Sequence, residues 1–486
     1  MYKYVMCLVW SMVFSSYFVI RTRAGTYLQF TPTETTDNTD NTRTHIRFVP
    51  YPHFAISPSY LKAVMASSPL RVAIVGGGLA GMATALALNE LSIHCVVFEM
   101  RKTNAAPPLS SGALMLSPNS LRILERFGIY QKLLEKSYAF EYVYYKNAEE
   151  ETIDRYPLGN EELFGYKALR VYRQELLDLL YEACYARNIP IHFNKKFSEV
   201  VEETPNSVTF GFADGTTETA SLLIGADGIH SKIRNYVTPG VEKNFIGLTA
   251  LTWEVPTSQL RIPSDKDYVF PTSVQTANGT FVLAPQKPDG AAMLAGTQFP
   301  IEELDRDAWD KLFADKEGLI ERARKNIDVW PDIVQSSMEN IKPDTLNLWA
   351  FYAIPRLENW TSGMHRRVVI LGDAAHAIPP TTGQGASQAF EDASTLALMV
   401  SALSEKGSAE WEEALQCWQK IRQDRIDDLL VLTKQLNNKR LPPSAQASLS
   451  REELWTDESA ENPRQMAWLY DPKTEDIVKE WIKMHQ

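Results

Sequence analysis

LRVAIVGGGLAGMATALALNELSIHCVVFE, residues 70–99, is the stretch that decides the fold. Residues 71–75 are a short apolar, β-branched run, which predicts a buried strand. The Ala- and Leu-rich residues 79–89 predict a helix, and the apolar residues 93–98 predict a second strand. Strand, glycine-rich turn, helix and strand in this order predict the βαβ unit of a Rossmann-like parallel sheet.

The turn in this unit has the pattern G-x-G-x-x-G at Gly76, Gly78 and Gly81. The first glycine permits the tight turn, the second lets backbone approach a pyrophosphate, and the third lets the helix pack closely on the sheet. Glu99 follows eighteen residues after Gly81, where it can accept hydrogen bonds from an adenosine ribose. The stretch therefore predicts a dinucleotide site, but by itself it does not distinguish NAD from FAD.

The composition is that of an ordinary globular protein. The chain has 486 residues, 44% of them hydrophobic and 22% charged, which suffices for two to three domains. Its net charge of −11 argues against a nucleic-acid partner, because phosphate binding requires a basic face. The four cysteines show no paired spacing, which excludes a disulfide framework and a Cys-based zinc site, and no metal site is predicted.

The N-terminal region leaves three alternatives open. Residues 5–20 are apolar and precede Arg21, so they predict either a membrane anchor or a signal-peptide core. Met65 stands just before the first strand and would make a normal start, so residues 1–64 could also be an artefact of the gene model. We predict a cytoplasmic protein, with membrane contact through residues 5–20 as the alternative.

The chain changes character twice after Glu99. From about residue 241 to 346, strand-like segments follow one another without intervening helices, which predicts an antiparallel sheet. The parallel-strand pattern returns at residues 368–372, and two helices follow. The predicted fold is α/β, a discontinuous Rossmann-like domain with an inserted antiparallel β-sheet substrate domain and a C-terminal helical segment. The predicted bounds are 1–64 for the N-terminal segment and linker, 65–240 and 346–410 for the nucleotide domain, 241–345 for the substrate domain, and 411–486 for the C-terminal helix and tail.

A second informative stretch is GDAAHAIPPTTGQGA, residues 372–386. Asp373, at the carboxyl end of a strand, can accept hydrogen bonds from a polyol. Gly383 and Gly385 open a helix, and their bare N–H groups would favour negative charge on the pyrimidine edge of a flavin. This combination favours FAD over NAD.

The two stretches and Gly225-Ala226-Asp227-Gly228 between them resemble the three signatures of the single-component FAD-dependent monooxygenases. These are hydroxylases of the p-hydroxybenzoate and salicylate type, and the likeness is strongest to the branch used in fungal secondary metabolism. The resemblance extends from about residue 70 to residue 403. The chain has no second G-x-G-x-x-G, which fits a family in which NAD(P)H has no domain of its own.

The resemblance implies the cofactor-binding residues. They would bind the FAD pyrophosphate, adenosine ribose, ribityl chain and flavin ring, and Asp227 belongs to a motif linked to FAD and NAD(P)H handling. The residues are Gly76, Gly78, Gly81, Glu99, Gly112, Arg173, Asp227, Asp373, Gly385 and Ala386.

The resemblance also implies the reaction. NAD(P)H would reduce FAD, O2 would add to give a C4a-hydroperoxyflavin, and one oxygen would hydroxylate or epoxidise an aromatic or polycyclic small molecule. No catalytic side chain is identified; Tyr268 is a weak candidate for a base, and His376 is interpreted as structural. A reductase or oxidase that inserts no oxygen is the alternative, and a flavin-binding scaffold without turnover is a third.

One departure from the family pattern bears on the substrate. Related hydroxylases often carry an arginine in the first strand of the sheet domain, where this chain has Thr252 or Trp253. A small anionic substrate would need such a fixed cation. The sequence therefore favours a larger, more neutral polyketide, alkaloid or terpenoid.

Overall fold

The chain forms two units, Met1–Val64 and Met65–Gln486. The computed structural model describes residues 18–21, 27–30, 70–104, 112–363, 365–403 and 408–485. In the first unit, β1 (Phe18–Arg21) and β2 (Tyr27–Phe30) form an antiparallel pair. The apolar run at 5–20, and with it the predicted membrane contact, lies mostly outside the described residues. None of the described helices is long and apolar enough to cross a membrane.

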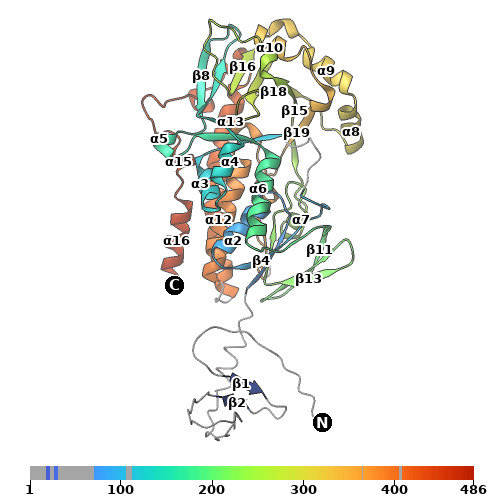
Figure 1. Cartoon of the computed structure of the whole chain (residues 1–486), viewed down its shortest axis with the longest axis vertical. Coiled ribbons are helices and arrows are strands. Elements are labelled where there is room, and N and C mark those ends of the chain that lie inside the picture. Colours follow the sequence, from blue (N-terminus) through green and yellow to red (C-terminus); the bar gives the residue numbers. More distant parts are fainter. Residues whose placement is uncertain are drawn as a thin grey trace, which may run out of the picture. The chain divides into compact units, whose positions relative to one another are not determined.

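The second unit contains a five-stranded parallel sheet in the order β10-β4-β3-β14-β20, of which β4 is labelled in Figure 1. Its strands are β3 (Arg71–Val75), β4 (His94–Phe98), β10 (Ile191–His192), β14 (Leu222–Gly225) and β20 (Val368–Ile370). The βαβ unit predicted from residues 70–99 is confirmed. Strand β14 pairs with β3 on one side and with β20 on the other, so strands at residues 71–75 and 368–370 share one sheet. The α/β fold class is confirmed.

Helices rich in small residues pack against this sheet and each other. Helix α2 (Leu79–Glu90) lies beside α12 (Gly385–Leu403) and α6 (Arg173–Ala186). A Cβ built on Gly372 would lie 3.2 Å from the Cβ of Ala80 and 3.3 Å from that of Ala389. The loop after β20 is therefore wedged between α2 and α12, which brings the two glycine-rich stretches together.

The second large sheet has seven strands in the order β19-β15-β18-β17-β16-β7-β8. They are β7 (Tyr142–Lys146), β8 (Thr152–Pro157), β15 (Asn244–Pro256), β16 (Thr272–Thr276), β17 (Gly279–Pro285), β18 (Ala292–Pro300) and β19 (Asn347–Ala353). All neighbours are antiparallel except β16 and β7, which pair in parallel. The sheet thus extends beyond the predicted bounds of 241–345, because β16 recruits β7 and β8 from an earlier part of the chain.

One face of this sheet packs on helices α8 (Arg306–Ala314), α9 (Lys316–Arg324) and α10 (Asp332–Ser337), drawn in yellow in Figure 1. Trp253 is buried in the resulting apolar core, and its indole N–H donates to the carbonyl of Ser337 at 3.0 Å. Because neighbouring side chains on a strand point to opposite faces, Thr252 and Glu254 lie on the other face. Thr252 therefore points away from the apolar core that buries Trp253.

A small antiparallel sheet has the order β5-β9-β6. Its strands are β5 (Ala113–Leu116), β6 (Tyr138–Phe140) and β9 (Ala168–Tyr172).

The second unit also contains further helices and strands. They include α3 (Pro118–Arg126), α4 (Tyr130–Glu135), α5 (Glu161–Phe164), β11 (Phe197–Glu203), β12 (Val208–Phe212), β13 (Thr217–Ala220), α7 (Lys232–Val237), α11 (Asp373–His376), α13 (Ser408–Lys439), α15 (Ala467–Tyr470) and α16 (Thr474–Met484).

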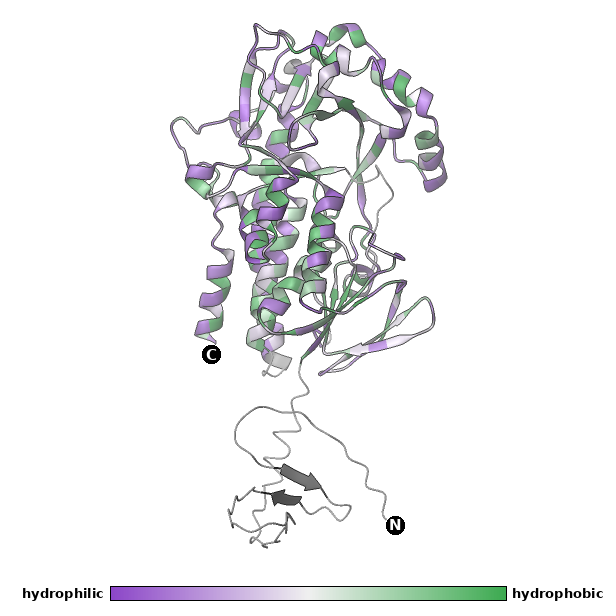
Figure 2. Cartoon of the chain, viewed as in Figure 1, coloured by the Kyte–Doolittle hydropathy of each residue, from purple (hydrophilic) through white to green (hydrophobic). Residues whose placement is uncertain are grey.

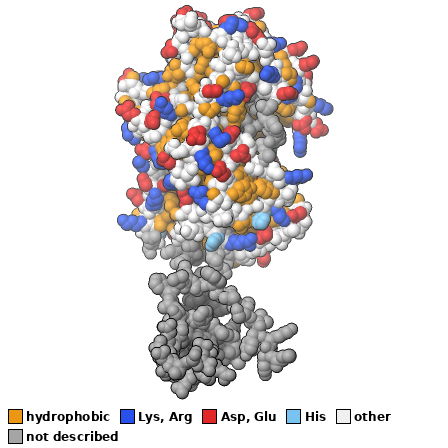
Figure 3. Space-filling model, viewed as in Figure 1, with side chains coloured by type: hydrophobic (Ala, Val, Ile, Leu, Met, Phe, Trp, Pro, Cys, Tyr) orange, Lys and Arg blue, Asp and Glu red, His pale blue; other side chains and the backbone are white. Residues whose placement is uncertain are grey.

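The outer surface follows the amphipathic pattern of its helices. In α16, purple and green turns alternate (Figure 2), and Thr474 and Val478 are its buried residues. Figure 3 shows acidic and basic side chains interspersed over the visible face of the described chain.

Candidate functional site

The glycine-rich segment after β3 packs too closely on neighbouring backbone for a side chain at Gly76 or Gly81. Gly76 has φ +111°, and a Cβ there would lie 2.3 Å from the carbonyl oxygen of Ala226. A Cβ on Gly81 would lie 1.9 Å from the carbonyl oxygen of Gly76. The turn is therefore pressed against the end of β14 and the start of α2, as the sequence predicts for a dinucleotide turn.

Other glycines of the predicted site border open space. A Cβ built on Gly78, Gly112 or Gly385 would meet no atom of the described residues within 4 Å. The backbone carbonyl of Gly112 accepts the N–H of Arg173 at 3.1 Å, which joins β5 to the start of α6. Bare backbone facing open space at three separate places fits a long ligand such as FAD, which would fill the volume that side chains leave.

Glu99 is buried at the end of β4, with 4% of its surface exposed. Its Oε2 accepts the N–H of Gly77 at 2.6 Å, and its Oε1 accepts the backbone N–H and the Nε of Arg101 at 2.7 and 3.0 Å. The carboxylate therefore also fixes the glycine turn, a role that its position in the sequence does not indicate. Ribose binding by Glu99 stays a prediction.

Asp373 and Arg173 come from distant parts of the chain and sense each other's charge. Both side chains are exposed, yet surrounding protein raises the pKa of Asp373 and lowers that of Arg173 by desolvation. The opposite charge of each partly offsets that shift in the other. Accessible but poorly hydrated groups of opposite sign are suited to contact a polar ligand between them, as expected for the ribityl and diphosphate parts of FAD.

Asp227 has a local role in the structure. Its Oδ2 accepts the N–H groups of Lys232 and Ile233 at 2.9 and 3.4 Å, which caps the start of α7. Its Oδ1 is buried without a hydrogen-bond partner, and burial raises its pKa. The residue thus holds the turn after β14 against Gly76, and any direct contact with cofactor stays a prediction.

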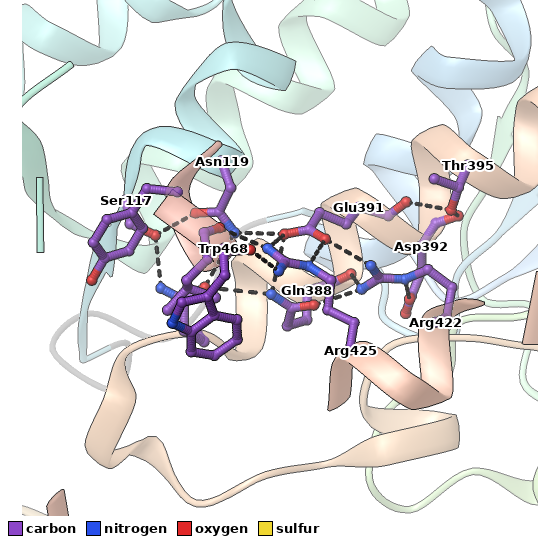
Figure 4. A network of polar contacts seen from close by, with 12 residues as sticks. Ser117, Asn119, Gln388, Glu391, Asp392, Thr395, Arg422, Arg425 and Trp468 are labelled. Carbon is purple, nitrogen blue, oxygen red and sulfur yellow. Dashed lines mark hydrogen bonds and ion pairs between the residues drawn. The ribbon is translucent and has the colours of Figure 1, made fainter. Parts of the chain in front are cut away.

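A buried polar network lies behind the start of α12 (Figure 4). Asn119 donates from its amide to Gln384 Oε1 at 3.2 Å and to Glu391 Oε1 at 2.7 Å, and Gln384 donates to Ser117 Oγ at 2.7 Å. These bonds tie the segment after β5 to the turn that precedes Gly385. The network therefore fixes the helix start that would face the flavin ring.

The same network continues to the loop that carries Asp373. The carboxylate of Asp392 accepts the N–H of Gly372 at 2.9 Å and the Nε of Arg422 at 2.7 Å, and contacts His376 Nε2 at 2.6 Å. Arg422 also donates to Glu391 Oε2 at 2.7 Å. His376 is thus engaged within the protein, which agrees with its interpretation as structural.

The carboxylates of this network are ionised in spite of their burial. Burial alone would raise both values, but Arg425 and Arg422 hold the pKa of Glu391 at about 2, and His376 and Arg422 hold that of Asp392 at about 2. Sequence reasoning missed this network. Two adjacent acids inside a small-residue helix, with Arg422 and Arg425 one turn apart on the next helix, are the signal that could have found it.

Tyr268, the weak candidate for a base, contacts other protein groups. Its hydroxyl donates to Glu150 Oε1 at 2.8 Å, and the Nζ of Lys146 lies 4.5 Å from its ring centroid. Burial and this hydrogen bond raise the pKa of Tyr268. A phenol whose proton is retained in this way is poorly suited to accept another group's proton.

The comparisons with known proteins agree with this geometry. The FAD binding domain family matches residues 69–430. The chain is 30% identical to 6-hydroxynicotinate 3-monooxygenase of Pseudomonas fluorescens, over 74% of this chain and 89% of that protein. It is 28% identical to the FAD-dependent monooxygenase penE of Penicillium thymicola, over 74% of this chain and 77% of that one. A salicylate hydroxylase substrate complex has the same fold, with a TM-score of 0.67, 22% identity, and 85% and 98% of the two chains covered.

Proposed function

The chain belongs to the FAD-binding monooxygenase family, and from that premise we propose that this FAD-dependent oxidoreductase uses NAD(P)H and O2 to hydroxylate or epoxidise an aromatic or polycyclic small molecule. The relatives' names refer to aromatic substrates such as 6-hydroxynicotinate.

The convergence of three distant segments is the observation that carries the proposal. Gly372 is wedged between α2 and α12, so the first glycine turn, Asp373 and the start of α12 lie around one region. Beside Gly78, Gly112 and Gly385, a built Cβ would meet no atom of the described residues within 4 Å, so each position leaves room for a ligand. This is the set of contacts that an extended dinucleotide with a polyol chain requires.

When bound, FAD supplies the redox chemistry, taking electrons from NAD(P)H and activating O2. The chain's own residues bind and orient the groups around it. The N–H groups of Gly385 and Ala386, at the start of a 19-residue helix, stabilise negative charge at the ring edge by about 0.3–2 kcal/mol. Asp373 would accept hydrogen bonds from the ribityl hydroxyls, and residues 378–381 would lie beside the ring and keep water from it.

Anaerobic reduction followed by exposure to oxygen tests the proposal. The purified holoenzyme should be reduced by NADH or NADPH and, with O2 and a panel of aromatic and polycyclic compounds, should release a product that has gained one oxygen atom. Reoxidation without an oxygenated product from any compound would favour the reductase or oxidase alternative. A flavin that neither nucleotide reduces would contradict both and leave a binding protein.

Asp373→Asn is expected to lower the affinity for FAD by about 10- to 100-fold, because a charged acceptor is worth roughly 1.5–3 kcal/mol to its hydrogen bonds. The fold should survive, since Asp373 is exposed. Flavin content after dialysis and a fluorescence titration of the apoprotein with FAD measure the effect. Full flavin content and unchanged turnover in this variant would remove Asp373 from the predicted site.

A further inference from the structure

Arg170 is a buried cation with little to bind. It lies in the middle of β9, has 5% of its surface exposed, and donates from Nη2 to Gln286 Oε1 at 2.9 Å. Its Nε is buried and has no hydrogen-bond partner among the residues that the structure describes. Within the described ranges, it forms no ion pair with a carboxylate.

Its surroundings in the protein do not compensate this charge. Burial lowers the pKa of Arg170 to about 10, and the only electrostatic contribution that opposes this shift comes from Tyr172. The carboxylate of Glu254 accepts the hydroxyl of Tyr172, and among the described residues it forms no ion pair with Arg170. Buried charges in folded proteins are normally paired, so a buried guanidinium of this kind calls for an anion that the described chain does not supply.

The position of Arg170 indicates which ligand would supply that anion. On β9, Leu169 and Val171 enter the main apolar core, so Arg170 and Tyr172 point to the opposite face. Their contacts there are Gln286 and Glu254, both at the same end of the seven-stranded sheet.

On its other side, β9 connects with the predicted cofactor region through the neighbouring strand β5. Tyr172 pairs with Ala113 and is followed by Arg173, whose N–H bonds to Gly112. Strand β9 therefore joins the predicted FAD contacts, which follow it, to the substrate sheet, which the guanidinium of Arg170 reaches at Gln286.

We propose that Arg170 binds an anionic oxygen of the substrate and determines specificity for acidic substrates. This rests on the proposed monooxygenase function. The oxygen is that of a phenol or enol bound as its anion, or that of a carboxylate, since a guanidinium N–H donates well to either. Arg170 thus supplies, from β9, the fixed cation that is missing at Thr252 of β15. The proposed substrate is therefore acidic and not neutral as the sequence favours, but it is still larger than salicylate.

Binding to the oxidised holoenzyme without NAD(P)H tests this proposal separately from turnover. The probes are 4-nitrophenol with its ether 4-nitroanisole, and 4-nitrobenzoate with its methyl ester, titrated while the flavin absorbance is recorded. The wild type should bind at least one acid about 10- to 100-fold more tightly than its methylated partner. The phenol pair and the benzoate pair distinguish the two sources of the oxygen. A wild type with no preference for either acid would overturn the proposal, even if product formation had established the monooxygenase.

Arg170→Met should abolish the preference while binding the methylated probes as the wild type does, and Arg170→Lys should retain part of it. Arg261→Met is the matched control, because Arg261 is an exposed arginine paired with Asp332. Flavin content and melting temperature verify that each variant is folded. A folded Arg170→Met protein that keeps the full preference would also overturn the proposal. Should Arg170→Met not fold, the comparison between the wild type and Arg170→Lys decides.

Discussion

Gly78→Ala is expected to lose most of its FAD while keeping the stability of the wild-type apoprotein. A Cβ at this position meets no protein atom within 4 Å, so the change costs the fold little. The same methyl group would lie where the pyrophosphate must approach the backbone. We expect an affinity for FAD at least about 10-fold lower, measured by fluorescence titration, with an apoprotein melting temperature close to that of the wild type.

Two further glycines separate cofactor binding from folding. Gly81→Ala should destabilise the apoprotein itself, because its Cβ would lie 1.9 Å from the backbone of Gly76. Gly363→Ala should change neither the FAD affinity nor the stability of the apoprotein. That glycine is exposed, its Cβ would meet no described atom within 4 Å, and it is not one of the predicted cofactor residues. If Gly78→Ala bound FAD as tightly as Gly363→Ala does, the pyrophosphate would not lie at this turn.

The parts of the fold that the sequence predicts are those that depend on local patterns. Hydrophobic periodicity predicts the strand and the helix at residues 70–99, and Gly76 and Gly81 predict the tight turn and the close helix packing. The βαβ unit therefore forms as predicted. The helix from Gly385 follows from its alanines in the same way. The family resemblance implies that Asp373 and Arg173 contact one cofactor, and in the fold the charge of each shifts the pKa of the other.

What the sequence does not predict depends on pairing between distant residues. Residues 142–157 alternate as strands in any sheet, and only the parallel pairing of β7 with β16 assigns them to the substrate sheet. In the sequence, Arg170 looks like an exposed residue at the start of a helix. In the structure it lies in β9, and its side chain donates to Gln286. For Glu99 the sequence predicts ribose binding, and it does not predict the hydrogen bond from the N–H of Gly77, because the two residues are 22 positions apart in the chain.

The buried network behind the site should be the most sensitive point for stability. Arg422 is fully buried and contacts Glu391, Asp392 and Gln388. Arg422→Met would leave two buried carboxylates with less compensation, and breaking one partner of a buried pair costs about 3–5 kcal/mol. Chemical unfolding of the apoprotein at neutral pH measures this. Arg261→Met, which removes an exposed arginine, should cost about 0–1 kcal/mol.

The pH dependence of that loss identifies its cause. The pKa of Glu391 falls from 4.5 to about 2 in the fold, and that of Asp392 from 3.8 to about 2. Since the unfolded carboxyls bind protons more readily than the folded ones, the stability that they contribute is present above pH 4.5 and is lost as the pH falls towards 2. In Arg422→Met these folded pKa values rise, so the wild type should lose more stability on acidification and the gap between the two proteins should narrow. A gap that stays constant from neutral pH down to pH 3 would mean that Arg422 stabilises the fold by packing rather than by its charge.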